Sequence, residues 1–195
     1  MIGTPFAGRA GLRHFLIILV TCLTACQTNG KHLAVEERDL PESMTEFAAT
    51  PSGKDRLTAL YLLVHINLSP ARIERVIEGC KVAEGDLDRL LCAYFIYGKT
   101  QSSSAARDFV SAFPSDRDGL KKLFGDSMTI EMPTDLIDLL HNLATTDSTA
   151  LKKLIVASMA ADGWVAESLN GALRQLNASN PDRISGARKD IGAGS

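Results

Sequence analysis

Apolar residues recur at intervals of three and four along most of the chain after position 41, which is the period of an amphipathic helix. One such stripe consists of Leu57, Leu60, Tyr61, Val64 and Leu68. No stretch of this region alternates between apolar and polar positions, as a half-buried strand would. The pattern predicts an all-α fold.

Helix-start signals divide the same region into short helices. Ser69-Pro70 combines a capping residue with proline in the first turn, and Asp116 and Asp147 precede apolar periodic runs. After a short helix over 41–49, we expect helices to begin near residues 53, 69, 86, 103, 115, 133, 147 and 163. Glycine favours helix ends, so we expect helices to stop at Gly85, Gly98 and Gly125. The sequence therefore predicts about eight short helices in an antiparallel bundle or an irregular helical-hairpin array.

The spacing of these starts, 12 to 18 residues, leaves a second arrangement open. Two helices in about 34 residues is the geometry of tetratricopeptide repeats. Ala93, Ala105, Phe109 and Ala112 match the relative spacing of the small and aromatic positions of that repeat. The other predicted helix pairs do not keep the pattern, so we favour an irregular array over a tetratricopeptide-like one.

The first 26 residues have the organisation of an export signal. Arg9 and Arg13 give a positive start without acidic residues, and the apolar run Phe15–Leu23 is too short to span a bilayer. The ending Leu23-Thr24-Ala25-Cys26 resembles the lipobox of bacterial lipoproteins. That resemblance implies removal of residues 1–25 and acylation of Cys26, which would anchor the chain to membrane lipid. Gln27 after the cysteine, in place of Asp, favours the outer membrane. The alternatives are a secretory leader cut elsewhere and a lone short anchor helix.

The predicted mature chain is mildly acidic and has three parts. Removing Arg9 and Arg13 from the 21 basic residues leaves 19 against 23 acidic ones, a net charge of −4. This balance argues against nucleic acid as a partner, because phosphate binding needs a concentrated basic face. Residues 26–40 are polar and predict a flexible tether, residues 41–179 a single helical domain. Residues 180–195 show no evident apolar period and predict a disordered tail.

Two of the four cysteines, Cys80 and Cys92, belong to the predicted domain. If a helical hairpin turns at Gly85, Cys80 lies five residues before the turn and Cys92 seven after it. At 1.5 Å per residue the two side chains reach about the same height on neighbouring antiparallel helices. An exported chain meets an oxidising compartment, so we expect a disulfide between them. Two buried free thiols are the alternative.

Two other patterns resemble functional motifs but fit a structural role better. Ala93–Thr100 matches a relaxed P-loop, yet four bulky residues stand where phosphate binding needs a glycine-rich loop. Asp135, Asp138 and His141 suggest a metal cluster, but positions six apart do not share one helix face. Asp135 and Asp138 more simply stabilise the positive end of a helix. We therefore expect no cofactor and no bound metal.

The sequence supports two classes of function. The first is a lipid-anchored helical adaptor that contacts an unidentified envelope protein, and Tyr97 and Trp164, at predicted helix ends, are its candidate partner-binding residues. The second is an enzyme or small-ligand-binding lipoprotein whose site is assembled from scattered residues. We favour the first class, since no catalytic motif was found along the chain.

Overall fold

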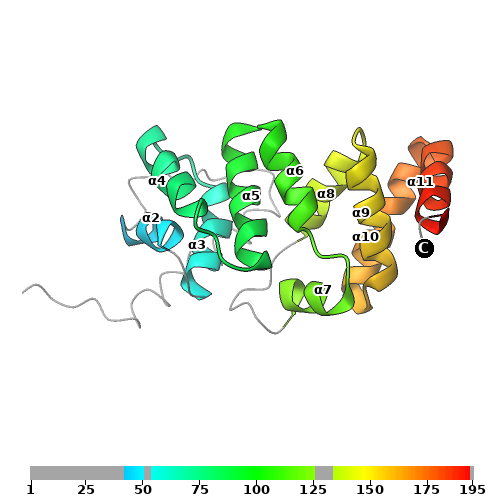
Figure 1. Cartoon of the computed structure of the whole chain (residues 1–195), viewed down its shortest axis with the longest axis horizontal. Coiled ribbons are helices and arrows are strands. Elements are labelled where there is room, and N and C mark those ends of the chain that lie inside the picture. The colour runs from blue at the N-terminus through cyan, green and yellow to red at the C-terminus, as the bar shows by residue number, and fades with distance from the viewer. Residues whose placement is uncertain (1–41, 51–53, 126–133, 194–195) are drawn as a thin grey trace, which may run out of the picture.

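The computed structural model describes residues 42–50, 54–125 and 134–193, so Cys26 and the segments predicted as leader and tether lie outside the described residues. Within the described ranges, ten helices follow one another along an elongated array, from α2 at one end to α11 at the other (Figure 1). Their bounds are α2 Glu42–Ala49, α3 Lys54–Val64, α4 Pro70–Cys80, α5 Asp86–Thr100, α6 Ser103–Ala112, α7 Arg117–Phe124, α8 Asp135–Ala144, α9 Ser148–Ala160, α10 Gly163–Ser179 and α11 Pro181–Ala193. The prediction of an all-α fold is confirmed.

Short polar side chains begin several of these helices by accepting backbone N–H groups that have no partner in the first turn. The Asp116 carboxylate accepts the N–H of Gly119 at 2.8 Å, and the Asp147 carboxylate accepts the N–H of Thr149 at 2.6 Å. Ser102 caps α6 by accepting the N–H of Ala105. The helix starts at α7 and α9 therefore follow the capping residues that the sequence predicts.

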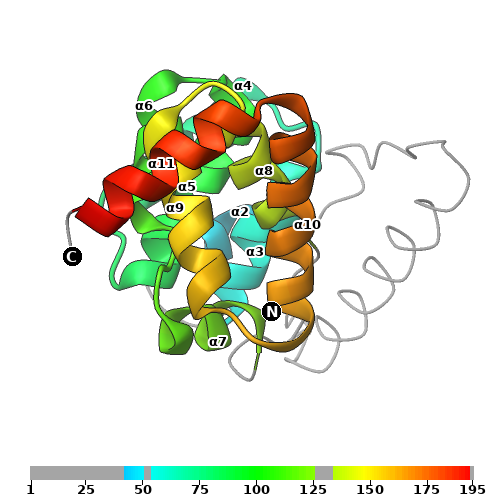
Figure 2. The same cartoon turned by 90° about the vertical axis from the view of Figure 1, so that its right-hand side faces the viewer.

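The helices enclose one continuous hydrophobic core that extends from Met44 in α2 to Ala187 in α11. In the N-terminal half, α2 packs against both α3 and α4, while α3 packs against α5. Further along, α8, α9 and α10 all pack against one another, and Figure 2 shows α11 crossing the end of this group. The mixed pairing in the first half favours an irregular array over regular repeats. Among the described helices, none is both long and apolar enough to cross a membrane.

Two expected helix ends are wrong. α4 ends at Cys80, five residues before Gly85, and Gly85 instead precedes α5 with a φ of +81°. α5 continues through Gly98 to Thr100 and ends where Gln101 adopts a φ of +53°. A Cβ atom on Gly98 would lie 2.7 Å from Cγ1 of Val64. Gly98 therefore leaves room for the Val64 side chain at the end of α3.

The predicted disordered tail is wrong for residues 181–193, which form α11. Ile184 and Ala187 are buried, and Ile191 packs partly against the same core. Arg183 fastens the start of α11 by donating from Nη1 to the carbonyl oxygens of Ala144, at 2.7 Å, and Thr145. The apolar stripe of α11 is narrow and consists of Ile184, Ala187 and Ile191, which is why its period is weak in the sequence.

Gly79 allows α4 to touch α2, and this contact generates a prediction. A Cβ atom at position 79 would overlap the backbone of Ala49, whereas one at Gly186 in α11 has no neighbour within 4 Å. We expect Gly79→Ala to lower the free energy of unfolding by about 1–3 kcal/mol through overpacking. Gly186→Ala should raise it by about 0.5–1 kcal/mol because alanine favours a helix. Urea unfolding of both variants measures this, and equal effects would contradict the close α2–α4 contact.

Candidate functional site

An exposed tryptophan marks a small cavity where α7 meets the turn between α9 and α10. Trp164 stands in the first turn of α10 and keeps 46% of its surface exposed, although it is the largest apolar side chain of the domain. The cavity holds about 140 Å³. Its apolar lining consists of Leu120, Phe124, Ala161, Trp164 and Val165. We call this cavity the Trp164 cup.

Charged residues form the rim of the Trp164 cup. Arg117, in the first turn of α7, donates from Nε to Oδ2 of Asp162 at 3.0 Å. Both side chains are largely exposed, and Lys121 lines the same cavity. An apolar base with a charged rim is the composition that protein interfaces favour, with a desolvated centre surrounded by polar groups.

The indole is held from behind by a continuous series of aromatic contacts. Phe124 meets Trp164 edge to face at a centroid distance of 5.5 Å, which is a favourable geometry for two rings. From Phe124 the contacts continue through the core to α3, and their members are Phe113, Phe109, Tyr94 and Tyr61. Trp164 is therefore fixed against a buried framework rather than attached to the surface alone.

Tyr97, the other candidate partner-binding residue, does not join the Trp164 cup. It lies inside α5 rather than at a helix end, because α5 continues to Thr100. Its side chain is half-buried, and the residues that line the cup come from α7, α10 and the segments next to them. The structure thus separates the two aromatic residues that the sequence proposes together.

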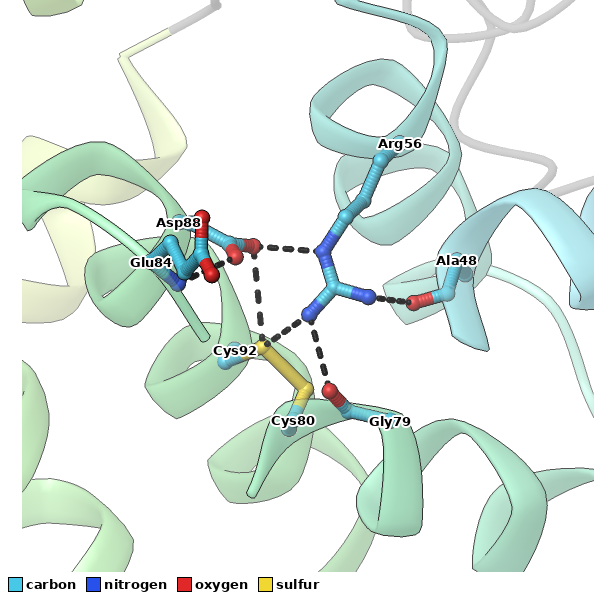
Figure 3. The surroundings of a disulfide bond; sticks show 7 residues. All are labelled: Ala48, Arg56, Gly79, Cys80, Glu84, Asp88 and Cys92. Atoms are coloured by element: carbon cyan, nitrogen blue, oxygen red, sulfur yellow. Dashed lines mark hydrogen bonds and ion pairs between the residues drawn. A yellow bond between two sulfur atoms is a disulfide. The ribbon is translucent and has the colours of Figure 1, made fainter. Parts of the chain in front are cut away.

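A second site is a buried arginine beside the disulfide. Arg56 in α3 is fully buried, and its guanidinium contacts three other helices (Figure 3). It donates from Nε to Oδ1 of Asp88 in α5 at 2.7 Å, and from Nη1 to the carbonyl oxygen of Ala48 in α2 at 2.6 Å. Nη2 donates to the carbonyl oxygen of Gly79 in α4 at 3.1 Å. We call these residues, with the disulfide, the Arg56 cluster.

The disulfide completes the Arg56 cluster. The structure joins Cys80, the last residue of α4, to Cys92 in α5, which is the expected pair, although α4 ends at Cys80 and does not continue to a turn at Gly85. Nη2 of Arg56 also donates to Sγ of Cys92 at 3.4 Å. The second oxygen of Asp88 accepts the N–H of Glu84 at 3.0 Å. A buried charge needs this degree of pairing, since an unpaired one is costly in a low-dielectric interior.

Arg56 was not predicted as a site residue, although the sequence contains a signal for its burial. Arg56 shares a helical stripe with Ala59, Leu60 and Leu63, all of which are buried. A cavity of about 400 Å³ lies beside Arg56 and Asp88. The two side chains are only 1% and 8% exposed and already bind each other. The two charges therefore neutralise each other inside the domain and do not form a binding site for an external ligand.

A third cluster forms around Asp135, a residue weighed as a metal ligand from its spacing to Asp138 and His141. Tyr61 Oη donates to Oδ2 of Asp135 at 2.9 Å, and Nε2 of His65 lies 3.3 Å from the same oxygen. His141 lies elsewhere, in a cavity that it shares with Arg183. No group of three or more potential metal-binding side chains is found in the described parts of the chain. Asp135 thus joins α8 to α3.

The residues of the P-loop-like pattern also have a structural role. Lys99 is half-buried and donates from Nζ to the carbonyl oxygen of Val64 at 2.8 Å and to that of Ile66. These carbonyl groups lie at the end of α3 and just beyond it, where helix carbonyls have no partner in the helix. Burial lowers the pKa of Lys99 from its usual value. The ammonium group caps α3.

The Tyr61 phenol should make stability sensitive to alkaline pH. Burial, together with the charge of Asp135, raises the pKa of Tyr61 well above its usual value in the folded state. The folded protein therefore favours neutral Tyr61, and this stabilisation is present below about pH 10 and declines above it as the unfolded phenol ionises. Tyr61→Phe should cost about 1–2 kcal/mol at pH 7 through the lost hydrogen bond.

Tyr61→Phe should also make the free energy of unfolding decline less steeply at alkaline pH. Urea unfolding of wild type and Tyr61→Phe between pH 8 and pH 11 gives the two curves, which we expect to converge as pH rises. Curves that stay parallel over this range would contradict a coupled Tyr61–Asp135 contact.

Comparison with protein-family models, with characterised proteins and with solved structures gives no match. The contacts within the chain are therefore the basis for assigning a function. The relevant features are the exposed Trp164 cup and two clusters, around Arg56 and Asp135, that join the helices.

Proposed function

We propose that this chain is a lipid-anchored protein of the bacterial envelope whose helical domain binds another protein through the Trp164 cup. The observation that carries the proposal is the half-exposed indole of Trp164, held edge to face on the buried ring of Phe124. A large aromatic side chain that is already fixed loses little conformational entropy when a partner covers it. Tryptophan is also enriched among the residues that dominate binding energy at interfaces.

The size of the Trp164 cup indicates what it would accept. A cavity of about 140 Å³ is smaller than the 300–1,000 Å³ typical of small-molecule sites. It suits one apolar side chain of a partner protein, and the charged residues Arg117, Lys121 and Asp162 surround it at the rim. At the Trp164 cup, this size favours contact with a protein side chain over binding of a small ligand.

Export and anchoring rest on two features. Residues 1–26 carry the lipobox-like signal that ends in Cys26. Independently, the domain contains a disulfide, and disulfides persist mainly in oxidising compartments. With Gln27 after the lipidated cysteine, the proposed location is the outer membrane, with the domain facing the periplasm.

Site-specific crosslinking in cells tests the binding site. A photoreactive amino acid at Ala161, which lines the Trp164 cup, should give a discrete adduct with an envelope protein. Trp164→Ala should reduce that adduct at least about tenfold, which is the loss of an interface hot spot. Met159→Ala is the matched control, because Met159 is 76% exposed near the same turn and is not part of the cup lining.

Two results would contradict the proposal. The first is an adduct that survives Trp164→Ala in a protein with wild-type unfolding free energy. The second is loss of the adduct to the same extent in Met159→Ala. The anchor is tested in the same cells, because Cys26→Ala should abolish labelling by radioactive palmitate. Retained labelling would refute lipidation at Cys26 and leave the binding site to be judged by the crosslinks.

A further inference from the structure

We propose that the Cys80–Cys92 disulfide is a thiol–disulfide exchange site, at which a dithiol protein attacks Cys80 and Cys92 leaves as a thiolate beside Arg56. The two sulfurs have different surroundings, and the difference gives the exchange a direction. This inference does not depend on the Trp164 cup or on the lipid anchor.

The disulfide has an open side and a closed side. Cys80 is partly exposed at the end of α4, whereas Cys92 is only 4% exposed inside α5. Both cysteines line a surface cavity of about 490 Å³, which Ile96, Asp108 and Ala112 help to form between α5 and α6. The opposite side is closed by Arg56, as Figure 3 shows. An incoming thiolate therefore approaches the disulfide from the cavity, where Cys80 is the more exposed of the two cysteines.

Electrostatics favours Cys92 as the leaving group. Nη2 of Arg56 lies 3.4 Å from Cys92 Sγ and can donate to a thiolate there. Cys80 is the last residue of α4, where the negative end of the helix dipole disfavours a thiolate. Exchange is faster when the leaving thiol is the more acidic one. Both effects point to attack at Cys80.

The carboxylate of Asp88 only partly offsets this preference for Cys92 as the leaving thiolate. Its Oδ1 lies 4.0 Å from Cys92 Sγ, and a carboxylate at that distance disfavours a thiolate. Oδ1 also accepts a hydrogen bond from Nε of Arg56, and Oδ2 accepts the N–H of Glu84. The carboxylate charge is therefore balanced by two donors, while Nη2 of Arg56 remains directed at the sulfur.

The exchange balances as two successive displacements. A thiolate of the dithiol partner attacks Sγ of Cys80, a new S–S bond forms to the partner, and the Cys80–Cys92 bond breaks with its electron pair on Cys92. The partner's second thiolate then attacks its own sulfur in the mixed disulfide and releases Cys80. The partner ends as an intramolecular disulfide, and Cys80 and Cys92, after taking up two protons, end as thiols.

We expect the helices to keep their packing when the disulfide is reduced. After reduction, Arg56 still joins α3 to the carbonyl oxygens of Ala48 and Gly79 and to Asp88. The covalent link between α4 and α5 is lost, but the hydrogen bonds that hold α2, α4 and α5 around the guanidinium remain. The reduced protein can therefore be oxidised again without refolding.

Mapping the mixed disulfide in the oxidised wild-type protein tests the proposal. The protein is exposed briefly to a limiting amount of reduced glutathione at pH 8, free thiols are blocked with N-ethylmaleimide, and peptides are analysed by mass spectrometry. We expect glutathione on Cys80 and maleimide on Cys92, with at least about a tenfold excess over the reverse pattern. Glutathione mainly on Cys92, or equally on both, would refute the proposal.

Two further measurements separate exchange in the native state from reduction after unfolding. The rate of reduction should not rise in low concentrations of urea, and a rate that follows global unfolding would also refute the proposal. Arg56→Lys should reduce the preference for Cys80, whereas Arg89→Lys, on the cavity side of α5, should leave the preference unchanged. If Arg56→Lys does not fold, the wild-type mapping decides alone.

Discussion

The guanidinium of Arg56 is the constraint on which the N-terminal half of this molecule depends. A charge buried to this degree must be paired, and Arg56 in α3 finds its partners on α2, α4 and α5. These helices would lose their common contact if any of them shifted. The same guanidinium contacts Cys92, so the covalent link between α4 and α5 and the buried charge fix the same place in the fold.

The N-terminal half, held together around Arg56, also helps to position the distant Trp164 cup. α5 carries Asp88 near its start and Tyr94 in its middle, so the Arg56 cluster also sets where the aromatic contacts begin. Those contacts pass through α6 and α7 and end on Trp164, the half-exposed ring of the Trp164 cup. Asp135 also joins α8 to α3 by accepting a hydrogen bond from Tyr61. The proposed binding surface is thus backed by a packed interior, which suits recognition by contact.

Local chemistry made part of this structure predictable, and distant contacts did not. Asp116 and Asp147 cap helices through neighbouring N–H groups, so their positions reveal the starts of α7 and α9. The cysteine pair was expected from two helices that meet at Gly85, and the pairing is correct although α4 ends earlier, at Cys80. α11 was missed because its buried stripe is narrow. Arg56 and the Tyr61–Asp135 contact were missed because a charge on an apolar stripe, or a partner 74 residues away, gains meaning only once the helices are packed.

The unfolding free energy of Arg56→Met in the oxidised protein tests the central role of the buried guanidinium most directly. The variant keeps an apolar stem of similar length but leaves Asp88 without its charged partner, and we predict a loss of about 3–5 kcal/mol. Arg75→Met removes an exposed ion pair with Glu46 from the same half and should cost less than about 1 kcal/mol. Equal, small losses for the two variants would contradict the account, because the fold would then not depend on Arg56.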